Sequence, residues 1–143
     1  MRGDRIAIMQ TVQVAAGIIW RNGRFLAAKR PEGKPRAGYW EFPGGKQEPG
    51  ESIRETLVRE LREELDILCV TVLMWQSLCH DYPDLRVVLH FMHVVEFSGE
   101  PLPKDGQQLR WLTPEEARKL PFLPADKAVI DALQPPVVRA NSC

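Results

Sequence analysis

Residues 44–67, GGKQEPGESIRETLVRELREELDI, constrain this chain more than any other stretch. Ser52 and Glu55 have the spacing of a capping box, in which each side chain accepts a hydrogen bond from the other residue's backbone amide. The residues from there to about Leu65 contain neither proline nor glycine. The sequence therefore predicts a glycine turn, a short loop and then one uninterrupted helix.

This predicted helix has an apolar face and an acidic face. At about 100° per residue, its apolar side chains gather on one side: Leu57, Val58, Leu61 and Leu65. On the same wheel Glu60, Glu63 and Glu64 fall within one neighbouring arc of about 100°. Three carboxylates so placed repel each other, and Mg²⁺, which prefers carboxylate and water oxygens and bridges substrate phosphates, would remove that repulsion. The alternative is a solvated acidic face paired with Arg59 and Arg62.

The whole spacing in this stretch resembles the signature of the Nudix hydrolases, G-x5-E-x7-R-E-U-x-E-E-x-G-U with U aliphatic. Here it begins at Gly45 and continues through Glu51 and Arg59 to the acidic helix. The preceding WEFPGG is similar to the MutT branch of that family. One position departs, because Asp66 replaces the last glycine. The family glycine suits a left-handed helix cap, which Asp tolerates better than most residues, so the departure affects the cap and not the metal face.

The resemblance implies cleavage of a nucleoside diphosphate linked to another group, with Mg²⁺ as cofactor and Mn²⁺ as a substitute. The positions that match the metal-binding and catalytic carboxylates are Glu60, Glu63 and Glu64, with the Gly44 carbonyl as a further ligand. The spacing does not say which glutamate is the general base. Asp105, in the loop KDGQ, matches a MutT carboxylate that reaches the metal; the alternative is an ordinary acid on a surface loop. Glu51 and Arg59 are expected to pair and fix the loop to the helix rather than to touch substrate.

Four more residues are candidates for substrate binding. Arg30 matches an arginine that contacts the phosphates in MutT relatives, a task that suits its forked guanidinium; otherwise it is a solvated strand end. Lys46 is a second candidate for a phosphate contact. Phe42 packs either on a base or in the core. Asp126 either reads the base edge, accepting from amino groups as on guanine or cytosine, or caps the last helix.

Composition sets the broad class. A chain of 143 residues predicts one domain over 1–143, with a core at about 11–133, a flexible N-terminal start and a Pro-rich C-terminal tail. Formal net charge is zero, which argues against long nucleic acid as a partner, and no apolar run has the length of a membrane span. Three cysteines without metal-ligand spacing favour free thiols and a cytoplasmic location. We expect a monomer or homodimer.

The expected fold is α+β: the α/β/α sandwich of the Nudix domain with a mixed central sheet. Strands are predicted at 11–20, 24–29, 39–42, 68–78, 85–97 and 107–112, and helices at 52–65, 114–120 and 125–133. Asn22-Gly23 predicts a tight hairpin, and 80–84 a loop.

The leading functional hypothesis is a nucleoside triphosphate pyrophosphohydrolase that acts on substrates such as 8-oxo-dGTP. The alternatives are a pyrophosphatase for CTP, modified pyrimidine triphosphates or nucleotide sugars, and a non-catalytic nucleotide-sensing module. Such modules usually lose the acidic triplet, which is intact here.

Overall fold

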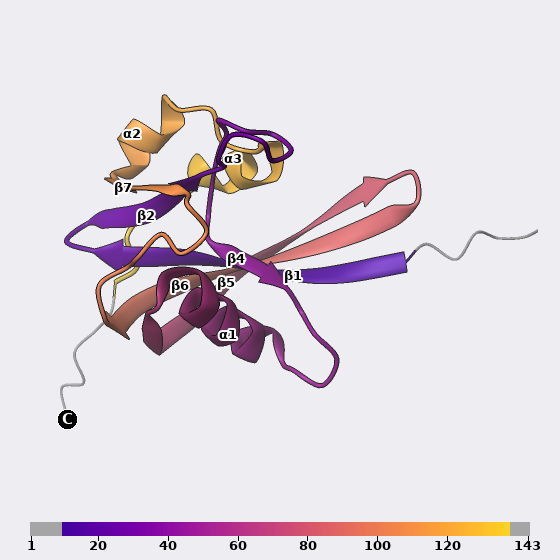
Figure 1. Cartoon of the computed structure of the whole chain (residues 1–143), viewed down its shortest axis with the longest axis horizontal. Coiled ribbons are helices and arrows are strands. Elements are labelled where there is room, and N and C mark those ends of the chain that lie inside the picture. The colour runs from indigo at the N-terminus through magenta and orange to yellow at the C-terminus, as the bar shows by residue number, and fades with distance from the viewer. Residues whose placement is uncertain (1–9, 138–143) are drawn as a thin grey trace, which may run out of the picture.

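The computed structural model describes residues 10–137 (Figure 1). The predicted loose start at 1–10 lies almost entirely outside these residues, as does the end of the Pro-rich tail. The elements in chain order are β1 (Gln10–Arg21), β2 (Arg24–Lys29), β3 (Trp40–Glu41), β4 (Gly44–Lys46), α1 (Ile53–Leu65), β5 (Leu68–Tyr82), β6 (Leu85–Ser98), β7 (Gln108–Leu112), α2 (Pro114–Arg118) and α3 (Pro124–Ile130). No helix in this described part is long and apolar enough to cross a membrane.

The strands form a mixed sheet in the order β3-β2-β1-β6-β5, in which β4 also pairs with β1 and β7 with β2. Strands β1 and β6 run parallel over ten residue pairs, whereas the other pairs are antiparallel. The hairpin predicted at Asn22-Gly23 joins β1 to β2, and both residues have the positive φ that a tight turn requires.

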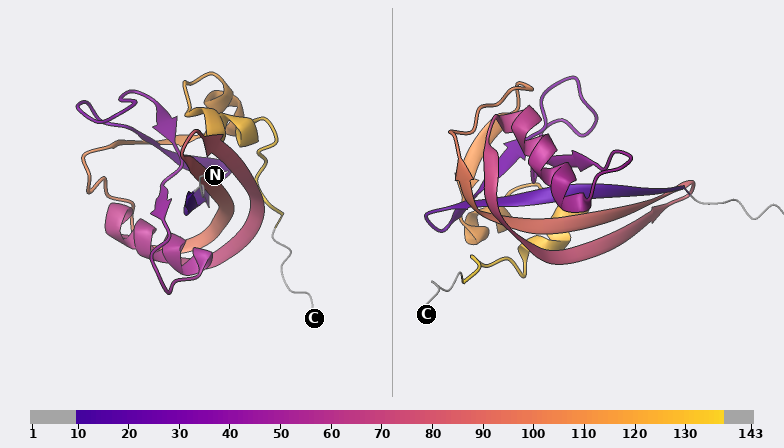
Figure 2. Two further views of the ribbon diagram at one scale, coloured as in Figure 1. Left: turned by 90° about the vertical axis from the view of Figure 1, so that its right-hand side faces the viewer. Right: turned by 90° about the horizontal axis from the view of Figure 1, so that it is seen from below.

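Both faces of this sheet are covered, α1 lying on one side and α2 with α3 on the other (Figure 2). Successive side chains of a strand point to opposite faces, so β1 contributes to two cores. Ala16, Ile18 and Trp20 belong to the core that includes the buried residues of α2 and α3. Ala15 and Ile19 belong to the core that includes the apolar face of α1. This is the predicted α/β/α arrangement.

Helix α1 matches its prediction closely. Ser52 and Glu55 form the capping box, and Leu57, Leu61 and Leu65 are fully buried. The helix ends at Asp66, which caps it in the left-handed conformation at φ 57° and ψ 37°. Its amide donates to the carbonyls of Arg62 and Leu61, so the cap forms without the family glycine.

Several predicted boundaries were wrong, including that of the last helix, expected at 125–133 and found at Pro124–Ile130. Gly44 and Gly45, expected in a turn, lie in β4 because the absent side chain lets this segment pair directly with Ala15 and Ala16 of β1. The loop expected at 80–84 is shorter, since β5 continues to Tyr82 and only two residues turn before β6. Cross-strand pairs extend this ladder to its tip, among them a two-bond ion pair between Asp81 and Arg86.

Candidate active site

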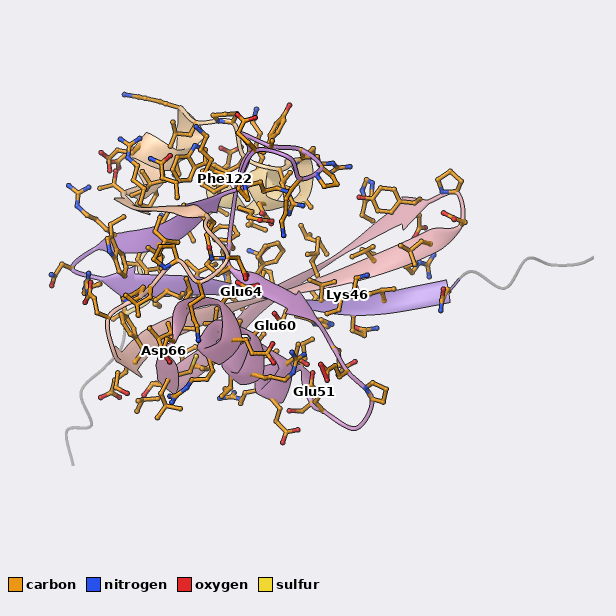
Figure 3. The ribbon with its side chains drawn as sticks, viewed as in Figure 1. Lys46, Glu51, Glu60, Glu64, Asp66 and Phe122 are labelled. Carbon is orange, nitrogen blue, oxygen red and sulfur yellow. The ribbon has the colours of Figure 1, made fainter. Side chains whose placement is uncertain are left out.

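Two glycines bring β4 close to both β1 and α1. A Cβ on Gly44 would lie 1.9 Å from the Ala15 carbonyl oxygen, so no larger residue fits there without moving the backbone. A Cβ on Gly45 would lie 2.3 Å from Cδ of Glu60. The bare backbone of β4 therefore lies directly against the acidic side of α1 (Figure 3), which places the Gly44 peptide next to the helix carboxylates.

Glu64 is the most perturbed of these carboxylates. Burial raises its pKa to about 8, with further increases from the negative charges of Glu60, Glu41 and Asp105, while a hydrogen bond from the Gly44 backbone opposes them. Three acids from α1, β3 and the loop before β7 thus act on the half-buried carboxylate of Glu64. Asp105 lines the same cavity as Glu64.

Arg59 holds the loop before α1 against the helix. Its guanidinium donates to both oxygens of Glu51, each at 2.8 Å, and to the Lys46 carbonyl at 3.0 Å. Hydrogen bonds from Arg59 first, and then from the Glu48 amide and the Thr56 hydroxyl, lower the pKa of Glu51 to about 2. Arg59 also bonds Glu60 at 2.9 Å and Glu63 at 3.3 Å. Glu60 is largely covered, whereas the side chain of Glu63 is 60% exposed.

The acidic residues suit a divalent cation by their chemistry more than by their present arrangement. Within residues 10–137, no three His, Cys, Asp or Glu side chains converge as a ready-made metal site. Arg59 occupies oxygens of Glu60 and Glu63, and Glu64 turns toward Gly44 and the cavity. The chemistry nevertheless fits a hard cation, because burial and then the neighbouring negative charges raise the pKa of Glu64, and a bound cation offsets that repulsion.

Beside Glu64 lies a cavity of about 220 Å³ that contains both signs of charge. Arg30 and Lys34 line it together with Glu41, Glu64 and Asp105. Arg30 is not a free solvated strand end, since it donates to the Pro35 carbonyl at 2.7 Å and to both Glu41 oxygens at 3.1 and 3.2 Å. Burial raises the pKa of Glu41, and Arg30 offsets part of that increase.

A second cavity of about 390 Å³ adjoins the first, with Glu41, Phe42 and Gly44 lining both. Its walls come from distant parts of the chain: β1, the 31–38 loop, β4, the β5–β6 hairpin and the start of α3. Most of the lining is apolar. The lining also includes Lys46, which is exposed.

Phe42 and Asp126 lie at the boundary between this cavity and the core. Phe42 is 5% exposed and packs against Phe25, Phe91 and Phe122, so it is a core residue that also lines the cavity. Asp126 is 6% exposed and accepts a hydrogen bond from the Phe42 amide at 3.3 Å. Burial raises the pKa of Asp126 to about 7.

The alternative interpretation of Asp126 as a helix cap is wrong. Leu123 is the N-cap of α3, and Asp126 lies in the first turn with its carboxylate directed to Phe42. Pro124 at the helix start explains the difference, because proline favours the first helical position and moves the start earlier than expected.

Several lining residues were not singled out from the sequence, among them Glu41, Lys34, His80 and Tyr82. Glu41 links the two cavities and pairs with Arg30. Its position beside Phe42 in the WEFPGG block was the available signal. His80 and Tyr82 also line the larger cavity. Both were expected in a loop, so the strand pattern that points alternate side chains to one face of the sheet was not applied to them.

Comparisons with known proteins agree with this geometry. A family model described as the NUDIX domain matches residues 14–132, so the chain belongs to the Nudix family. It is 43% identical over 124 residues to the CTP pyrophosphohydrolase of Escherichia coli K12, covering 87% of this chain and 92% of that protein. It is 35% identical over 127 residues to the 8-oxo-dGTP diphosphatase of the same organism, covering 88% and 98%.

Solved structures show the same relationship. The solution structure of the E. coli ORF135 protein matches with a TM-score of 0.79 and 44% identity, covering 87% of this chain and 89% of that one. A MutT structure from a study of Aliivibrio salmonicida and Vibrio cholerae matches with a TM-score of 0.76 and 34% identity, covering 86% and 96%. The predicted α+β fold and the assignment as a MutT-like hydrolase are confirmed.

Proposed function

We propose that the protein is a Mg²⁺-dependent pyrophosphohydrolase of nucleoside triphosphates. Water adds to a phosphorus atom, the anhydride bond between the α- and β-phosphates breaks, and the products are a nucleoside monophosphate and pyrophosphate. One observation carries this proposal: the cluster of acids around Glu64 lies where a charged cavity meets an apolar one. A nucleotide has the same two parts, a polyphosphate and a flat, mostly apolar base.

The phosphate end is assigned to the smaller cavity. Arg30 and Lys34 supply positive charge there, and Lys46 supplies it from the neighbouring rim. Glu64 lines this cavity beside Gly44 and Asp105, and its position makes it the candidate for the general base. Asp105 faces the same cavity and is the second candidate.

The residues that would hold the cation are Glu60, Glu64 and the Gly44 carbonyl, with Glu63 and Asp105 nearby. When bound, Mg²⁺, or Mn²⁺ in its place, neutralises phosphate oxygens and lowers the pKa of bound water. Glu51 and Arg59 hold the loop before α1 against the helix. Arg59 also bonds Glu60 and the Lys46 carbonyl of β4, so this pair positions the site without touching substrate.

The base is assigned to the larger cavity, with Asp126 at its edge. A neutral carboxyl donates one hydrogen bond and accepts one, which matches the N3 acceptor and the N4 amino donor of cytosine. This fits the 43% identity to a CTP pyrophosphohydrolase, and we propose a cytosine triphosphate as the substrate. An ionised Asp126 accepts two hydrogen bonds, matching N1–H and the N2 amino group of guanine bases, so 8-oxo-dGTP is the second candidate, supported by the relative at 35% identity.

The deciding experiment is a substrate panel with Mg²⁺: CTP, dCTP, UTP, dGTP and 8-oxo-dGTP, measured by pyrophosphate release. We expect the highest kcat/KM on a cytosine nucleotide, in line with the 43% identity to a CTP pyrophosphohydrolase. Glu64→Gln should lower kcat by at least about 100-fold, because the loss of a positioned general base typically has an effect of this size. The matched control is Glu115→Gln, which changes an exposed acid on α2. No pyrophosphate from any of the five nucleotides would refute the proposal.

We further infer a single domain acting on nucleotides as a monomer or homodimer. Zero net charge supports small nucleotides over long nucleic acid. The free thiols of Cys69 and Cys79 support a reducing compartment such as the cytoplasm. Size-exclusion chromatography with light scattering tests the oligomeric state, and a mass above that of a dimer would contradict it.

A further inference from the structure

The β5–β6 hairpin carries an aromatic pair at its tip. In Figure 1 this hairpin extends away from the helices, toward the start of β1. His80 and Tyr82 lie two residues apart on β5, with ring centroids 4.6 Å apart and planes at 67°, an edge-to-face arrangement. The Tyr82 side chain is still 37% exposed, so the pair is not part of either buried core.

Strand alternation directs this pair into the larger cavity. His80 and Tyr82 point to one face of β5, and both line the cavity together with Val87 and Leu89 of β6. Asp81, between them, points to the other face, where Arg86 binds both of its oxygens at 2.7 and 3.0 Å. Asp81 and Arg86 are cross-strand partners, so this ion pair is consistent with the register that directs His80 and Tyr82 to the cavity.

The same cavity has Asp126 among its lining residues, contributed by α3. Hydrogen bonds from a carboxyl reach only the edge of a base, so the faces of the ring need apolar or aromatic partners. On the core side Phe42 is tied into an aromatic cluster. Among the residues of 10–137 that line the cavity, His80 and Tyr82 are the only aromatic rings besides Phe42.

We propose that Tyr82, supported edge-on by His80, is the stacking wall for the nucleobase and a specificity-determining residue of this site. This inference rests on the proposed function. A base seated against Asp126 has its ring face covered from the hairpin, so Tyr82 contributes to binding the nucleoside and not to the chemical step at the phosphates. The hairpin tip is then a part of the substrate site built on the edge strand of the sheet.

The test compares Tyr82→Ala and Tyr82→Phe with the parent enzyme on the best nucleotide of the panel. Stacking of a base on one aromatic side chain is worth roughly 1–3 kcal/mol, so we expect Tyr82→Ala to raise KM about 5- to 140-fold with kcat within about twofold. Tyr82→Phe keeps the ring and should keep KM within about twofold. Inorganic tripolyphosphate, used as a competitive inhibitor, has no base, and its Ki should be the same in all variants.

The matched control is Tyr39→Ala, because Tyr39 is 42% exposed and does not line this cavity. It should leave KM unchanged. If the aromatic pair only stabilises the hairpin, Tyr82→Ala will lower Tm and leave KM at the parent value, which overturns the inference while the proposed function stands. A parallel increase in KM and in the tripolyphosphate Ki would also overturn it, since the tip would then act on the whole site. Absence of turnover in the parent is instead a failure of the proposed function.

Discussion

The replacement of Gly45 by alanine tests how closely the backbone of β4 positions Glu60. The new Cβ would lie 2.3 Å from Glu60 Cδ and 2.6 Å from each carboxylate oxygen, whereas ordinary contacts begin near 3.4 Å. The Glu60 carboxyl must therefore retreat by about 1 Å, a displacement that can reduce turnover about 100-fold at a precisely arranged site. Gly45 has no positive φ, so its backbone accepts alanine and the protein should remain folded.

The assay is pyrophosphate release with Mg²⁺, with Tm measured in parallel. Gly17→Ala is the matched control, because its Cβ would contact Leu57 at 3.0 Å and would disturb the packing of α1 without touching Glu60; it should lower Tm and change kcat by less than about threefold. In a Glu60→Gln background, Gly45→Ala should add little further loss, since both changes act on the same carboxylate. Parent-like turnover in a folded Gly45→Ala variant would refute the reasoning.

Three more predictions follow from individual side chains. Asp66→Gly should stabilise the protein by about 0.5–1 kcal/mol in urea unfolding with unchanged turnover, because glycine removes the cost of a left-handed cap; a loss of stability would contradict this. Asp126→Asn should remove a pH dependence of the free energy of unfolding. In the parent, the native state keeps the Asp126 proton up to about pH 7, whereas the unfolded state releases it near pH 3.8. Parent stability therefore falls as the pH rises through that window. The variant should gain roughly 2–3 kcal/mol relative to the parent between about pH 5 and pH 8, and a constant difference would show that Asp126 is ionised throughout. Arg59→Lys keeps the charge but loses the two-bond contact with Glu51, so kcat/KM should fall about 10- to 100-fold. Parent-like activity would show that Arg59 does not position the active site.

Local signals made much of this fold predictable. The capping box at Ser52 and Glu55 and the Asn22-Gly23 turn depend on hydrogen bonds and dihedral angles within a few residues, so the sequence contains them directly. The acidic helix was predictable for the same reason, since spacing along a helix determines which side chains share a face. Asp66 adopted the expected left-handed cap because a single residue can satisfy that geometry.

Features that depend on distant segments were not predictable. The pairing of β4 with β1 requires knowing that Gly44 meets the Ala15 backbone, and the hydrogen bond from the Phe42 amide to Asp126 joins residues 84 apart. The extension of β5 to Tyr82 comes from its partner strand and not from its own propensity. The base cavity combines several such contacts, which is why His80 and Tyr82 were not singled out as site residues.

The central claim is that the acidic side of α1 holds a divalent cation against the phosphates of a nucleotide. A crystal structure with Mg²⁺ and a non-hydrolysable CTP analogue tests it most directly. The account predicts Mg²⁺ within about 2.0–2.1 Å of carboxylate oxygens of Glu60 and Glu64 and of a phosphate oxygen. A structure with the analogue bound elsewhere and only water beside these two glutamates would contradict it.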